Sequence, residues 1–182
     1  MGHIRLARLP TGKRWKDVVE LLRVGSSVSD LAAATAHAAE TELNSAKGDP
    51  ALAYTVWLLT QLPLAARSLQ YPEKLRELGF DPGAEQSLLS LVAGFSKAVD
   101  RNVAGRAGRT DLGELARQAA AESLSSIVGA ATPFLFGSNA ENVRRELDRL
   151  ATKDRFASLA RDFFARLTQK TLEYYISREL PN

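Results

Sequence analysis

The chain of 182 residues has no cysteine, only two histidines and one methionine. Without cysteine it can form no disulfide, no thiolate nucleophile and no Cys-based metal site. His3 falls in an N-terminal arm and His37 in an Ala-rich stretch, which leaves almost nothing for a catalytic triad or a multi-histidine metal centre. The sequence therefore favours a function without catalysis, resident metal or cofactor, and it indicates no small-molecule substrate.

Charge is absent from Pro50 to Ala66, where apolar side chains fall on every side of a helical wheel. This pattern predicts a central helix over about residues 50–67, buried all round. Asp49 is a good N-cap, and Pro50 suits the first helical position because its missing N–H costs nothing there. Pro63 should kink or end the helix near Leu62. The run is too short and too polar for a membrane span, which needs about 20 apolar residues.

Strand patterns are also absent, since no stretch beyond the first eleven residues alternates at period two. We therefore expect an all-α, single-domain bundle of about seven helices around the central helix. Residues 1–11 should form an extended basic and apolar arm, and residues 12–182 the helical domain. The clearest apolar stripe at helical spacing consists of Leu88, Leu91, Val92, Phe95, Val99 and Val103.

The other expected helices follow local start and stop signals. Ser27 or Ser29 should cap a helix that ends near Ala46, and Thr110 should cap another after a Gly-rich loop. The apolar connector Pro133–Gly137 should plug the core. The remaining helices are expected over Lys13–Val24, Pro72–Leu78, from Ser138 or Asn139 to Leu150, and Asp154–Glu179.

Negative charge is missing from the first sixteen residues, so the positive charge of the chain is concentrated at its beginning. Five basic residues precede the first acid, Asp17. Removing them from the 24 basic residues leaves 19 against 21 acidic ones, so the rest of the chain is not basic. A nucleic-acid role would rest on phosphate contacts without sequence preference, made by the arm and by the loop after residue 100. Its candidate residues are Arg5, Arg8, Lys13, Arg14, Lys16, Arg101, Arg106 and Arg109.

Apolar residues of the arm and of the last helix exceed what a terminal tail and a surface helix need. In the last helix two adjoining stripes make the apolar face wide, and aromatic residues are favoured at interfaces. We expect both segments to contact a partner protein or a second copy. The candidate partner-binding residues are Ile4, Arg5, Leu6, Arg8, Leu9, Phe164, Tyr174, Tyr175 and Ile176.

The sequence as a whole predicts a non-catalytic helical accessory or scaffold subunit that acts through protein–protein contacts, in a bacterial multi-protein complex or as a homo-oligomer. The excess of Arg over Lys and the abundance of Ala are typical of GC-rich bacterial coding. Residues Met1 to Thr11 show no signal-peptide pattern, so we expect a cytoplasmic location and no membrane partner. The alternative is the phosphate-binding protein described above, and an enzyme of unknown type comes third.

Overall fold

Helices joined by turns make up the described part of the chain, and no strand occurs in it, so the expected all-α fold is confirmed. The computed structural model describes residues 13–27, 29–30, 33–35, 37–38, 48–106, 110–130 and 140–179. Of residues 13, 15, 22, 105, 106 and 175–179 it describes the backbone alone. The helices with defined bounds are α1 (Lys13–Arg23), α3 (Pro50–Ala66), α4 (Tyr71–Glu77), the 3-10 helix η2 (Ala84–Gln86), α5 (Leu88–Arg106), α6 (Asp111–Ala130), α7 (Ala140–Arg149) and α8 (Lys153–Glu179).

Several structural details predicted from the sequence agree with the structure. Ser27 caps the helical residues that follow it, since its hydroxyl accepts from the N–H of Asp30 at 3.2 Å. The apolar stripe of α5 is core, with Leu91 and Phe95 fully buried. The N-terminal arm, the expected helix end near Ala46 and the connector Pro133–Gly137 lie outside the described residues.

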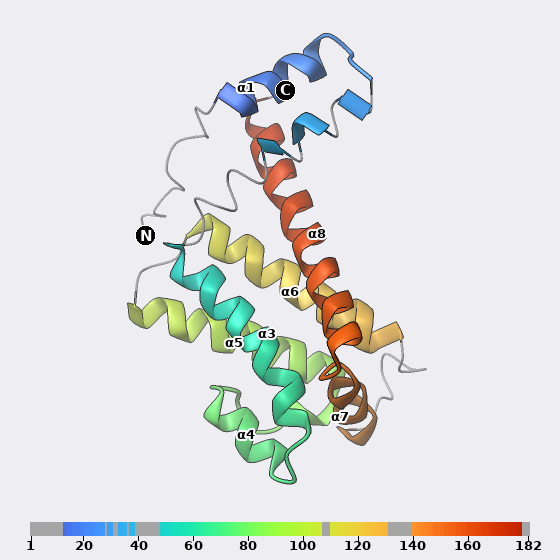
Figure 1. Ribbon diagram of the computed structural model, residues 1–182. Helices are drawn as coiled ribbons and strands as arrows, with labels where there is room; N and C mark the ends of the chain where they lie inside the picture. The colour runs from blue at the N-terminus through green and yellow to red at the C-terminus, as the bar shows by residue number, and fades with distance from the viewer. Residues whose placement is uncertain are drawn as a thin grey trace.

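The helix α6 packs against α3, α5 and α8, and α3 packs against α4, α5, α6 and α7 (Figure 1). The buried residues of α6 are mostly small and include Ala116, Ala119 and Ala120. Small side chains let neighbouring helices approach closely, so a helix of this composition can be surrounded on several sides. In α3, by contrast, large side chains lie on both sides of the helix. Leu58 and Leu62 are buried on one side, and Trp57 and Leu64 are exposed on the other.

The bounds expected for α3 are correct, whereas the expected burial on every side is wrong. The helix begins at Pro50 after the cap at Asp49, and Pro63 does not end it, because the helix continues to Ala66. It is not buried all round, since Trp57 is 44% exposed and Leu64 is 53% exposed. The periodicity of the sequence could not reveal this exposure, because an apolar residue gives the same pattern whether its side chain is buried by its own chain or exposed to water.

A close contact fixes the start of α3 against the start of α6. The Asp49 carboxylate accepts from the backbone N–H groups of Ala51 and Leu52, both at 2.9 Å. Its second oxygen accepts from the Thr110 hydroxyl at 2.7 Å, and that hydroxyl accepts from the N–H of Gly113 at 3.0 Å. The two helix caps are thus one hydrogen-bonded unit, which satisfies N–H groups at both helix starts.

The long helix α8 connects two apolar clusters. Its first half contributes Leu159, Phe163 and Leu167 to the main core, which draws on every helix from α3 to α8. Its second half extends to α1, as Figure 1 shows, where Leu172 and Tyr174 pack against buried Val18 and Ala38. Within the part of the chain that the structure describes, neither α8 nor any other helix combines the length and apolar character that a membrane crossing requires.

Candidate protein-binding surface

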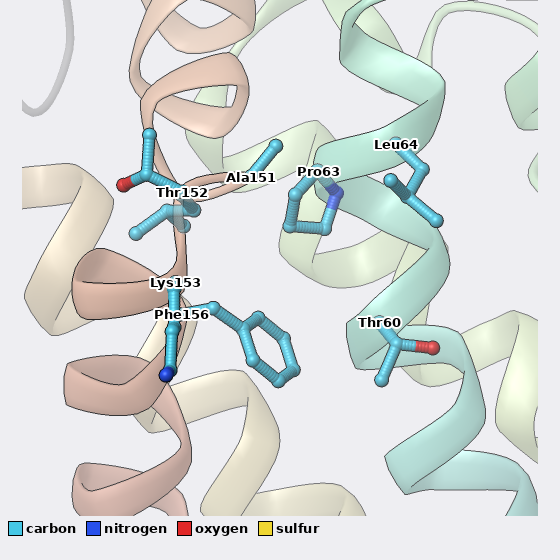
Figure 2. A pocket seen from close by; sticks show the side chains of 8 residues that line it. Thr60, Pro63, Leu64, Ala151, Thr152, Lys153 and Phe156 are labelled. Carbon is cyan, nitrogen blue, oxygen red and sulfur yellow. The ribbon is translucent and has the colours of Figure 1, made fainter.

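An apolar groove lies between the C-terminal half of α3 and the turn from α7 into α8 (Figure 2). Its volume is about 340 Å³. The Phe156 ring projects from α8 toward α3 across the groove, and Pro63 and Leu64 line the α3 side. The full lining is Thr60, Pro63, Leu64, Leu150, Ala151, Thr152, Lys153 and Phe156.

Three large apolar side chains of α3 and α8 are exposed: Trp57, groove-lining Leu64 and Phe164. Trp57 and Leu64 are seven residues apart, about two helical turns, so they lie on the same side of α3. Phe164, which is 42% exposed, follows groove-lining Lys153 by eleven residues, about three turns, and so lies on the same side of α8 as Lys153. We call the groove together with Trp57, Leu64 and Phe164 the α3–α8 face.

The side chains of this face are held in place by their neighbours. The Trp57 ring lies against Tyr54, with ring centroids 5.2 Å apart, and the Tyr54 hydroxyl donates to the carbonyl of Leu78 at 3.4 Å. The Thr60 hydroxyl donates back to the Trp57 carbonyl at 2.6 Å. The Phe164 ring meets buried Phe163 edge-on, with centroids 4.9 Å apart. A preorganised apolar surface loses little conformational entropy when a partner covers it.

The α3 helix is also fixed at its C-terminal end, by Arg144 of α7. The Arg144 guanidinium donates to the carbonyl of Ala66 at 3.0 Å and to that of Ser68 at 2.9 Å. It also lies over the Tyr71 ring, 5.9 Å from the centroid. These bonds satisfy carbonyls that a helix end leaves without intrahelical partners. With the bond between Asp49 and Thr110 at the other end, both ends of α3 are tied to neighbouring elements by hydrogen bonds.

The second hollow in this region is polar and lies between the end of α3 and α7, with a volume of about 230 Å³. Arg67 and Asp148 pair across it at 3.2 Å, and Arg144 is committed to the carbonyls of Ala66 and Ser68. Glu141 and Arg145 complete its charged lining. Three arginines thus face two acids in this lining, and Arg67 and Arg144 already have partners within the chain.

The chemistry of the α3–α8 face suits contact with another apolar surface. Lys153 is the charged member of the groove lining, and the other lining groups are methyl groups, rings and two threonine hydroxyls. Acidic side chains and histidine are missing from that lining. In the described ranges, no group of His, Cys, Asp or Glu residues is arranged to hold a metal ion.

The predicted partner-binding residues fall in different places. Phe164 lies on the α3–α8 face, as described above. Tyr174 is half-buried in the second cluster, and its hydroxyl donates to the Asp111 carboxylate, so this aromatic contacts its own chain. Tyr175 and Ile176 lie in α8, where only their backbone is described, and Ile4, Arg5, Leu6, Arg8 and Leu9 lie outside the described residues.

The predicted phosphate-binding residues are not gathered in one described site. The Arg101 guanidinium pairs with Asp81 and donates to the Gly79 carbonyl at 2.9 Å, and its hydrogen bond holds the pKa of Asp81 below its usual range. Arg14 and Lys16 are exposed on α1. Lys13 in α1 and Arg106 in α5 are described by backbone alone, and Arg5, Arg8 and Arg109 lie outside the described residues.

The sequence did not single out Trp57 and Leu64, because it assigned all of α3 to the core. One signal could have identified them. A helix buried by its own chain and a helix half-covered by a partner both exclude charge, so the uncharged run from Pro50 to Ala66 had two readings. Comparison of the chain with known protein families, with curated proteins and with solved structures gives no match.

Proposed function

We propose that the protein is a non-catalytic accessory or scaffold subunit that binds another polypeptide on the α3–α8 face. That polypeptide is either another subunit of a multi-protein complex or a second copy of this chain. This proposal retains the sequence-based hypothesis of protein–protein contacts and places the contact at Trp57, Leu64 and Phe164. The apolar groove of about 340 Å³ between α3 and the α7–α8 turn is the observation that supports it.

Physical reasons favour a polypeptide as the ligand. Each exposed apolar side chain gains free energy on burial, by about 25 cal/mol for each Å² removed from water. Tryptophan is enriched among the residues that dominate binding energy in protein interfaces. The groove is bordered by two helices, and an amphipathic helix laid in such a groove is a common recognition mode. A small polar metabolite would find few hydrogen-bond partners among these lining residues.

Site-specific photocrosslinking in the cell of origin tests the proposal. A benzoylphenylalanine placed at Trp57 should form a covalent adduct with a polypeptide that mass spectrometry can identify. The matched control places the same group at Leu89, which is 71% exposed on α5 and is not part of the α3–α8 face. Absence of an adduct at position 57, or the same adducts at both positions, would contradict the proposal.

The phosphate-binding alternative stays a prediction, because its arm and residues 107–109 of its loop lie outside the described residues, while residues 101–106 belong to α5. It expects duplex binding that weakens with salt, with a slope of about 0.9 in log K for each phosphate neutralised. Deleting residues 1–8 should then reduce both the affinity and that slope. A chain that binds neither duplex nor single strands at low salt would exclude this alternative.

A further inference from the structure

We draw no further inference here: the strongest candidate, the apolar groove between the C-terminal half of α3 and the turn from α7 into α8, belongs to the face already described, and nothing in the structure shows what covers it.

Discussion

The main core and the small cluster at the α1 end differ in how α8 is held. The first half of α8 enters the main core with Leu159, Phe163 and Leu167, which are fully buried. The second half offers Leu172 and Tyr174, which are half-buried against Val18 and Ala38. A single helix therefore connects a densely packed region to a sparsely packed one. Local stability should follow the packing, with the α1 end opening more readily than the bundle.

Polar contacts, in contrast, connect α8 to α6 in both regions. Arg166 and Lys170 pair with Glu122 of α6, at 3.7 and 2.7 Å, where the first half of α8 gives way to the second. Beyond them Tyr174 donates to Asp111 at the start of α6. These bonds connect α8 to α6 along its length, but ion pairs that are still partly open to solvent contribute little compared with buried apolar area. Packing should therefore decide which end opens first.

The largest effect should come from the main core. Phe163→Ala should destabilise the whole bundle by about 3–5 kcal/mol, because it leaves a cavity in a fully buried site. The neighbouring Phe164→Ala is the matched control and should cost less than half as much, since that ring is 42% exposed. Urea unfolding followed by circular dichroism measures both. Equal losses would mean that Phe164 is covered within the single chain.

A smaller loss should follow from crowding the joint between α3 and α6. A Cβ at Gly113 would lie 2.5 Å from the Ala51 Cβ and 2.9 Å from the Thr110 hydroxyl. Gly113→Ala should therefore cost about 1–3 kcal/mol through overpacking, despite the better helix propensity of alanine. Gly129→Ala, whose Cβ would lie 3.3 Å from a Leu88 methyl, should be close to neutral. Thermal unfolding of the two variants measures both changes in stability. A stabilised Gly113→Ala protein would show that the contact between α3 and α6 can accommodate the added methyl group.

A substitution in the second apolar cluster should destabilise only the elements that form this cluster. Val18→Ala removes a buried side chain from α1 and should weaken the packing there by about 1–2 kcal/mol. Because this cluster is separate from the main core, amide exchange should accelerate in α1 and in the second half of α8 and stay unchanged in α5 and α6. Half-buried Val19→Ala is the control. Faster exchange throughout the bundle would show that the two clusters unfold as one unit.

The smallest effect at neutral pH should come from Tyr71→Phe. The Tyr71 hydroxyl is buried without a hydrogen-bond partner, so its removal should be neutral or slightly stabilising. Burial raises the pKa of this hydroxyl, and the Glu85 carboxylate adds to the shift while Arg144 opposes it. The raised pKa means that the wild type keeps its stability below about pH 10 and loses it as the pH rises further.

The Tyr71 variant should therefore unfold less readily than the wild type in alkali, which urea unfolding at neutral and alkaline pH can measure. Tyr54→Phe is the comparison, because that hydroxyl has a partner in the Leu78 carbonyl. Identical alkaline losses in the wild type and in Tyr71→Phe would contradict the assignment of the loss to Tyr71.

The sequence by itself determined the helices, because their signals are local. Asp49 and Thr110 cap helices through bonds to N–H groups two or three residues away, and the α5 stripe repeats at the helical period. Bounds such as Pro50–Ala66 therefore agree with the prediction to about a residue.

Tertiary structure alone decided the surroundings of each helix. The packing of α6 against α3, α5 and α8, the exposure of Trp57 and Leu64, and the pairing of Arg101 with Asp81 all depend on residues from other elements of the fold. Tyr174 was expected on an outer face and instead donates to Asp111, which is distant in sequence. Periodicity reports which side chains avoid water, whereas packing between helices decides which of them their own chain covers.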